Sequence, residues 1–211
     1  GVNNTNQFIA AEPITKDLNP SHGSIQALKA RDTRLIMLCE DKVLRADTNR
    51  DLLFNADGDS QVVSSNAVIG SAVAYKGDYG ISNNPESLAV TPNNMFFTDV
   101  RRGKVLVLND NEGARAISDA GMKDFFADLM ASNVHSAIGS YDARKSEYNV
   151  SIGTKYGDQN QLSNQTTISY SEIAKGWSSF KDFKVDVTPT DGATVVKGLE
   201  QGISLNNNYF T

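Results

Sequence analysis

Cysteine is the scarcest reactive residue in this chain, since Cys39 is the single instance among 211 residues. One cysteine excludes an intrachain disulfide, and with it the class of small secreted scaffolds that disulfides hold together. Cys39 ends the apolar run Leu35–Cys39. This position predicts a buried structural thiol rather than a nucleophile.

Histidine is almost as rare, with His22 and His135 only. Neither lies at a spacing typical of a metal site or a catalytic triad, so surface or cap positions are expected for both. The chain also lacks G-x-S-x-G, H-E-x-x-H and a glycine-rich phosphate loop. We therefore predict a protein that is not an enzyme, with no catalytic, cofactor-binding or metal-binding residues and no cofactor.

Positive charge and long apolar runs are also in short supply. The 20 Lys and Arg residues are outnumbered by 25 Asp and Glu, giving a net charge of −5. This balance argues against a general nucleic-acid binder, which needs a basic surface. No run approaches the roughly 18 apolar residues of a membrane span, so none is expected.

The beginning of the chain shows no leader pattern. Residues Gly1–Asn6 are polar and do not resemble a signal peptide. Because position 1 is not Met, the chain is expected to be a processed or excised piece of a longer polypeptide, or a chain cut to this length for expression.

Short strands separated by turns are what the sequence has in abundance, and residues 79–110 show the pattern best. Apolar residues 87–90, aromatic residues 95–99 and β-branched residues 104–108 predict three strands. The turn between the first two contains Pro92 and two Asn residues, which favour tight turns. A meander this tight has to bury its faces against similar sheets.

Similar units flank this segment. Strands are predicted from Ser24 onward, in residues 34–39 and 42–46, and as two short strands in residues 61–75 because Gly70 and a polar stretch interrupt them. Residues 136–187 also read as strands, apart from a polar loop at 154–165. Strands at about 10-residue intervals suit a sandwich, a barrel or a propeller.

One helix is predicted at about 119–131. Ser118 is placed to cap it, and Met122, Phe125, Phe126, Leu129 and Met130 recur at helical spacing. The predicted organisation is an extended arm or linker at 1–23, a β domain at 24–187 that forms part of a larger one, and a loop with a truncated strand at 188–211.

Several residues could carry chemistry, but a structural interpretation is favoured for each. Asp142 with Glu147, or Glu86 with Asp99, could form a glycosidase acid/base pair, which would need carboxyls about 5–9 Å apart. Turn-stabilising and solvated carboxylates are the favoured alternative, and Asp99 is expected to accept backbone or arginine hydrogen bonds.

Three further features are interpreted in the same way. Asn55, Asp57 and Asp59 suggest a calcium loop, but Ser60 and Asn66 stand where the required Gly and Glu should be, so a plain turn is favoured. Arg101 and Arg102 could touch DNA, but a solvated turn is favoured for them. Trp177 could stack on a sugar, but a place in the core or an interface is favoured.

Two resemblances follow from these motifs. Residues Pro85–Val90, Phe96–Asp99 and Gly103–Val105 are similar to one blade of the YWTD or NHL propellers. In such blades the aromatic-Thr-Asp strand is an inner strand whose Asp ties adjacent turns together. One copy of the motif is clear, so the resemblance implies blade-like packing rather than a regular repeat.

The second resemblance covers most of the chain. It rests on Tyr79–Ser82, Asn84–Ser87, Phe97–Gly103, Ile117–Met122, Ile138–Asp142, Glu147–Tyr148, Ser171–Glu172, Gly176–Phe180 and Gly202–Asn207. Together these segments resemble large virion proteins of short-tailed bacteriophages, in which propeller-like domains build the tail nozzle, or muzzle, below the portal. The crAss-like phages and their marine relatives are the group in question.

The fold implied is mainly β, with antiparallel meanders packed as β-propeller-like blades and one short amphipathic helix at about 119–131. The function implied is that of a virion tail protein, made in the host bacterial cytoplasm, that assembles as a ring. Its partners would be copies of itself and adjacent tail or portal proteins, with DNA passing through the channel without specific binding.

Two other hypotheses remain open. One is a secreted or surface propeller that recognises protein or glycan, and the weaker one is a carbohydrate-active enzyme.

Overall fold

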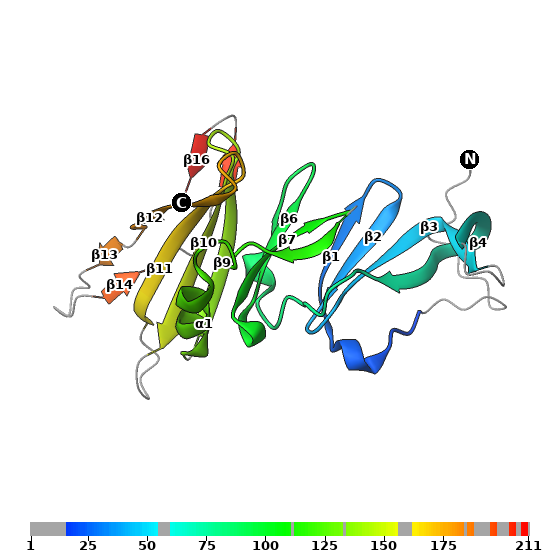
Figure 1. The fold of residues 1–211 in the computed structure, drawn as a ribbon, viewed down its shortest axis with the longest axis horizontal. Helices are drawn as coiled ribbons and strands as arrows, with labels where there is room; N and C mark the ends of the chain where they lie inside the picture. Colours follow the sequence, from blue (N-terminus) through cyan, green and yellow to red (C-terminus); the bar gives the residue numbers. More distant parts are fainter. Residues whose placement is uncertain are drawn as a thin grey trace. The chain divides into compact units, whose positions relative to one another are not determined.

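The computed structural model describes residues 16–54, 60–110, 112–132, 134–155, 162–183, 185–187, 195–197, 203–205 and 208–210 (Figure 1). Its contacts divide the chain into two compact units, Gly1–Tyr75 and Lys76–Thr211. The arm at 1–23 and the domain limits at 24–187 and 188–211 stay predictions. Residues 55–59, which include the suggested calcium loop, lie outside the described residues.

The first unit contains one antiparallel sheet whose four strands are neighbours in chain order. The strands are β1 (Ile25–Arg31), β2 (Arg34–Cys39), β3 (Val43–Phe54) and β4 (Ser60–Ala74). Met37, Cys39, Leu44 and Ala46 form a buried cluster on this sheet. Cys39 is fully buried, as predicted, and burial together with the charge of Glu40 raises the pKa of its thiol.

The prediction of two short strands in residues 61–75 is wrong, because β4 is continuous there. Its pairing with β3 shifts register on both sides of Thr48. A β-bulge lets one strand carry extra residues without ending the strand. Gly70 and the polar residues before it therefore lie within one continuous strand.

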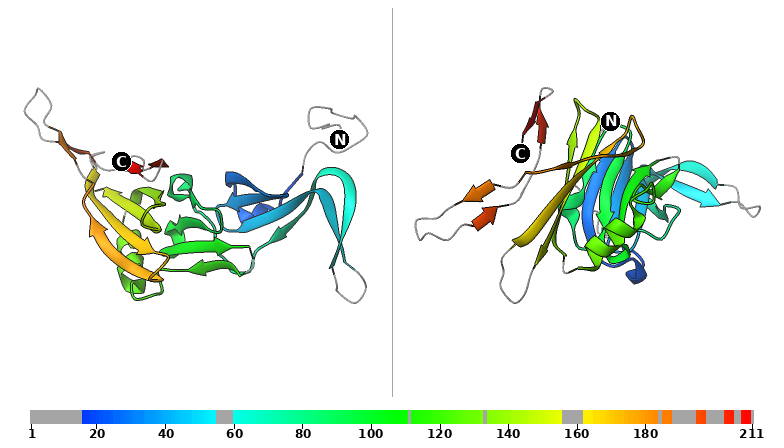
Figure 2. Two further views of the ribbon diagram at one scale, coloured as in Figure 1. Left: turned by 90° about the horizontal axis from the view of Figure 1, so that it is seen from above. Right: turned by 60° about the vertical axis from the view of Figure 1, so that its left-hand side comes forward.

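The second unit contains two more four-stranded antiparallel sheets, each again in chain order (Figure 1). The first comprises β5 (Ala89–Val90), β6 (Met95–Asp99), β7 (Lys104–Asn109) and β8 (Gly113–Ala116). The second comprises β9 (Val134–Asp142), β10 (Glu147–Lys155), β11 (Leu162–Ser171) and β12 (Gly176–Lys181). In Figure 2, β11 and β12 are the neighbouring yellow and orange strands.

Aromatic side chains join these two sheets. The ring of Phe96 on β6 stacks on that of Tyr148 on β10, with ring centroids 4.9 Å apart. Tyr141 and Tyr170 also lie against Phe96. The shared core is completed by aliphatic residues from β7, β10 and β11, namely Val105, Val107, Val150, Ile152 and Ile168.

A backbone contact holds the same two sheets together at η2 (Pro85–Ser87), the short 3₁₀ helix that precedes β5. The hydroxyl of Tyr148 donates a 2.8 Å hydrogen bond to the carbonyl oxygen of Ser87. A Cβ atom added to Gly139 on β9 would lie 1.9 Å from that oxygen. Glycine is therefore required at position 139 to let the backbone of η2 approach β9.

The helix is shorter than predicted. Helix α1 (Lys123–Ala131) begins after Met122, because Ser118 does not cap it. Ser118 is buried, and its hydroxyl instead accepts a 3.3 Å hydrogen bond from the backbone N–H of Val105. The helix buries Phe126 and Met130 against the shared core, as its apolar stripe predicted.

Strands extend further into polar sequence than predicted. The polar loop at 154–165 is wrong at both ends, since Gly153 pairs with Gln165 and Lys155 with Leu162. The loop predicted at the start of segment 188–211 is wrong at β14 (Val195–Lys197), which pairs with β13 (Val185–Val187). A second hairpin joins β15 (Ile203–Leu205) and β16 (Asn208–Phe210). Ladder hydrogen bonds use the backbone, so polar side chains do not prevent pairing.

The prediction of a mainly β protein with antiparallel meanders and one helix is confirmed for the described residues. No sheet in this part of the chain closes on itself.

Candidate functional site

The second sheet of the second unit has one apolar and one polar face. Alternation along β10 places Tyr148 and Val150 toward the aromatic core and Glu147, Asn149 and Ser151 on the opposite face. Neighbouring strands continue this polar face with residues that are also buried: Ser140 and Asp142 on β9, and Gln165, Thr167 and Ser169 on β11. Buried polar groups require partners, and most of these have one.

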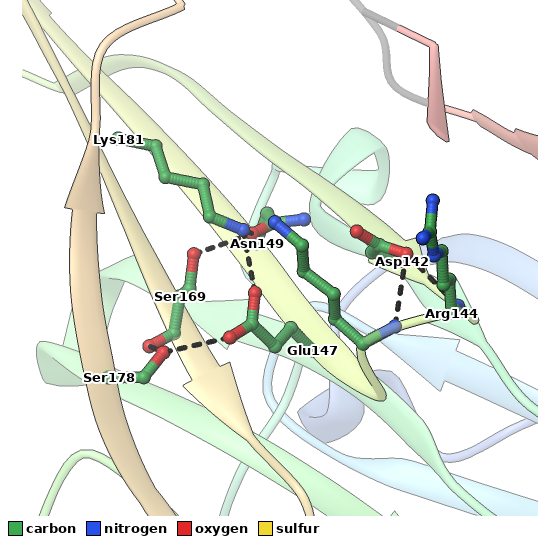
Figure 3. Close-up of polar contacts among 8 residues, drawn as sticks. Asp142, Arg144, Glu147, Asn149, Ser169, Ser178 and Lys181 are labelled. Atoms are coloured by element: carbon green, nitrogen blue, oxygen red, sulfur yellow. Dashed lines mark hydrogen bonds and ion pairs between the residues drawn. The ribbon is translucent and has the colours of Figure 1, made fainter. Parts of the chain in front are cut away.

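Lys181 is the centre of the polar face (Figure 3). Its side chain extends from edge strand β12 across β11 to β10. There the Nζ atom lies 2.7 Å from Oε2 of Glu147 and 2.8 Å from Oδ1 of Asn149. The side chains of Lys181 and Glu147 are only 17% and 15% exposed. This is an ion pair largely withdrawn from water.

Serine residues complete the arrangement. The hydroxyl of Ser169 donates a 2.6 Å hydrogen bond to Oδ1 of Asn149, and the hydroxyl of Ser178 donates a 3.2 Å bond to Oε1 of Glu147. Ser178 is the extra residue where the β11–β12 register shifts between Ser169 and Tyr170, so a bulge directs it toward Glu147 (Figure 3).

The charge state of Glu147 follows from these contacts. Burial alone would raise the pKa of Glu147. The hydrogen bond and charge of Lys181, with help from Ser178 and Lys145, outweigh burial and lower it. Glu147 is therefore a carboxylate anion paired with a cation at neutral pH.

One polar group of Asn149, its side-chain NH₂, takes no part in these hydrogen bonds. The residue is 0% exposed, and its Oδ1 accepts two hydrogen bonds. Its Nδ2 is buried with no hydrogen-bond partner in the described part of the chain. Unpartnered buried donors are costly, which makes this amide group the least expected feature of the sheet.

Asn149, Ser169 and Lys181 were not predicted as a group. A usable pattern was present, because polar residues at 147, 149 and 151 alternate with apolar residues at 148, 150 and 152. Lys181 offered no such pattern, since its reach across two strands is a tertiary feature.

The predicted acid/base pairs are engaged in structural bonds. Asp142 lies opposite Glu147 in the β9–β10 ladder, and its Oδ1 accepts hydrogen bonds from the backbone N–H groups of Arg144 (3.0 Å) and Lys145 (3.3 Å) (Figure 3). It thus stabilises the β9–β10 turn, as favoured, but the expectation that it is solvated is wrong, since Asp142 is buried.

Asp99 is fully buried at the end of β6. Its carboxylate accepts hydrogen bonds from Gly80 N–H, the Ser82 hydroxyl, Arg102 N–H and the Arg102 guanidinium. This confirms the expectation of backbone and arginine donors. Its suggested partner Glu86 is exposed in η2, and no interaction joins the two.

The remaining candidate residues lie apart from one another. Trp177 is half-buried against Phe126 and donates a 3.1 Å hydrogen bond to the carbonyl of Ile117, so it belongs to the core, as favoured. Arg101 is exposed in a turn and His135 is exposed on β9, while His22 ends a short 3₁₀ helix. No group of three metal-ligating side chains occurs among the described residues.

A small cavity of about 160 Å³ lies between the two sheets of the second unit. A chain of side-chain hydrogen bonds crosses its wall. Asn109 donates to Asn94 (3.2 Å), Asn94 donates to Glu172 (2.6 Å), and Tyr141 donates to the other oxygen of Glu172. Arg115 and Lys175 are the exposed cations at its rim.

Two tyrosines, the buried Tyr148 and the half-buried Tyr141, should make the protein sensitive to alkali. Burial raises the pKa of Tyr148, and burial together with the hydrogen bond to Glu172 raises the pKa of Tyr141 to about 12, against 10.0 in the unfolded chain. Above pH 10 the unfolded chain loses these protons while the folded chain keeps them. Stability is therefore complete below pH 10 and falls above it, by up to about 1.4 kcal/mol per pH unit for the buried Tyr148 and by less for the half-buried Tyr141, whose charge solvent screens.

Urea unfolding at pH 9, 10 and 11 measures this dependence. We expect Tyr148→Phe to flatten it and Tyr79→Phe, the matched control, to leave it unchanged. An equally steep fall in the Tyr148→Phe variant would contradict the assignment.

The chain matches no known family model, and no curated protein sequence matches it. In the part of the chain that the structure describes, no helix has both the length and the apolar character needed to cross a bilayer.

Proposed function

We propose that the chain is a non-enzymatic structural component of a bacteriophage tail, in the nozzle or portal-vertex region. Its four-stranded sheets act as blades of a β-propeller, and copies assemble as a ring around the tail channel. The resemblance of segments between residues 79 and 207 to short-tailed phage virion proteins supports this proposal.

The observation that carries the proposal is the packing of the second unit. Two consecutive four-stranded meanders stack face to face through Phe96 and Tyr148, which is the way adjacent propeller blades bury their surfaces. The carboxylates Asp99, Asp142 and Glu147 hold turns and strands together rather than meeting in a cavity. These features suit a scaffold.

Surfaces for neighbouring molecules are also present. β12 is the edge strand of its sheet, and Phe180 on it is 65% exposed. Ile173, in the preceding turn, is 80% exposed. Unpaired edges and exposed apolar groups favour association with other chains. The net charge of −5 suits a channel that DNA passes without being held.

Fractionation of phage particles tests this function. Antiserum against the chain should detect it in particles banded on a density gradient and still detect it after washing in high salt. Recovery of the chain only in the soluble fraction of the lysate would overturn the proposal.

The cavity favours one alternative, a secreted or surface propeller that binds protein or glycan. Its volume suits a single small polar group, and amide, carboxylate and cationic side chains line it. Saturable binding to a glycan array, lost in Arg115→Ala and retained in the more distant Arg144→Ala, would support this alternative over the scaffold.

A further inference from the structure

The amine of Lys181 and the side-chain amide of Asn149 lie within reacting distance. Nζ is 2.8 Å from Oδ1, and the two residues are 32 positions apart in the sequence. A carbonyl bond is about 1.2 Å long, so Cγ of Asn149 lies within about 4 Å of Nζ. Reacting atoms in productive complexes are about 3–3.5 Å apart. A small side-chain adjustment therefore brings the amine to the carbonyl carbon.

We propose that Lys181 and Asn149 form an intramolecular isopeptide bond, with Glu147 transferring the proton. The new bond joins Nζ of Lys181 to Cγ of Asn149 and links strand β12 to strand β10. It is independent of whether the chain works in a phage tail.

The reaction balances with the groups in place. Glu147 Oε2, 2.7 Å from Nζ, accepts a proton from the ammonium group and leaves a neutral amine. The amine attacks Cγ, and the electron pair of the carbonyl moves to Oδ1. The C–N bond to Nδ2 then breaks, and Nδ2 takes the proton held by Glu147 together with the second proton released by Nζ. The leaving group departs as an ammonium ion, and Glu147 returns to its carboxylate form. No oxidant, reductant or further reactant is needed.

The surroundings favour each step. The Ser169 hydroxyl donates to Oδ1, where negative charge develops in the tetrahedral intermediate. Nδ2 is free of hydrogen bonds in the described part of the chain, so none has to break when it leaves. Asn149 and Ser169 are both 0% exposed, which limits competition by water at the carbonyl carbon.

The bond would fasten an edge strand. Among the described residues β12 pairs with β11 alone, and Lys181 reaches past β11 to central strand β10. A covalent link of this kind restricts the unfolded chain as a disulfide does. It would give a chain without disulfides a permanent cross-link within its sheet.

Intact mass spectrometry of the purified 211-residue chain tests the proposal. The expected mass is lower than the sequence mass by one ammonia molecule, about 17 Da. Digestion should release a branched peptide that joins the segments containing Asn149 and Lys181. Both signatures should be absent from Lys181→Arg, which keeps the cation beside Glu147 and so keeps the fold.

Glu147→Gln should likewise retain the full sequence mass, because no carboxylate accepts the proton. Lys145→Arg, a change at a lysine that does not contact Asn149, should form the bond as the unaltered chain does. Thermal unfolding should show the Tm of Lys181→Arg lower by about 10 °C.

Two results would overturn the proposal. One is an unaltered chain at full sequence mass after several days at neutral pH. The other is a loss of ammonia that persists in Lys181→Arg, since the ammonia would then come from another asparagine. Bond formation in Glu147→Gln would overturn the role of Glu147.

Discussion

Substitution of Gly139 by alanine is expected to cost at least about 3 kcal/mol of stability or to prevent folding. The added Cβ would lie 1.9 Å from the carbonyl oxygen of Ser87 and 2.8 Å from the hydroxyl of Tyr148. Backbone atoms of η2 cannot move out of the way as a flexible side chain can. η2 has to withdraw from β9, and the Tyr148–Ser87 hydrogen bond that joins the two sheets is lost with it.

Chemical denaturation followed by tryptophan fluorescence measures this effect, because Trp177 lies in the same core. Gly176→Ala is the matched control. A Cβ atom there meets only the carbonyl oxygen of Ala174, at 3.8 Å, so we expect a change below about 1 kcal/mol. Equal effects of the two substitutions would refute the close contact at Gly139.

Replacement of Asp99 by alanine is expected to cost about 3–4 kcal/mol. The carboxylate is 0% exposed and accepts four hydrogen bonds, one of them from the Arg102 guanidinium at 2.9 Å. Without it, the N–H of Gly80 and the hydroxyl of Ser82 lose their acceptor inside the protein, and the turn at 100–102 loses its cap.

The matched control is Asp119→Ala. Asp119 also pairs with a cation, Lys104, but it is 47% exposed. Exposed ion pairs contribute at most about 1 kcal/mol, so the control should remain near the stability of the unaltered chain. Urea unfolding of both variants compares them. A loss in Asp99→Ala no larger than in the control would show that the buried carboxylate is not needed.

The strands could be predicted from sequence where apolar and turn-forming residues alternate clearly. Residues 95–99 and 104–108 were assigned correctly because aromatic and β-branched residues fill them and Gly103 ends the turn between them. The pattern failed where polar residues continue a ladder, as in residues 154–165. In that segment the backbone hydrogen bonds between β10 and β11 determine the structure, and the side-chain pattern does not predict them.

The helix shows a similar limit. The apolar stripe of the helix could be predicted from sequence. Its first residue could not, because the Ser118 hydroxyl can accept a hydrogen bond either from the helix or from β7. The packing of β7 beside Ser118 decides which of these two hydrogen bonds forms. That packing is a tertiary feature, which the sequence pattern around Ser118 does not reveal.

The candidate site was partly foreseeable. Asp99 and Asp142 end strands that run into turns, where carboxylates commonly accept backbone N–H groups, and the structure places both in that role. The group of Lys181, Glu147 and Asn149 required the order of three strands and a bulge at Ser178. Those are properties of the folded sheet.

The most direct test of the scaffold function is cryo-electron microscopy of the native phage particles. The account predicts that copies of this chain form a ring around the tail axis, with four-stranded sheets packed against each other as blades. Particles whose complete tail density leaves no place for these sheets would contradict it.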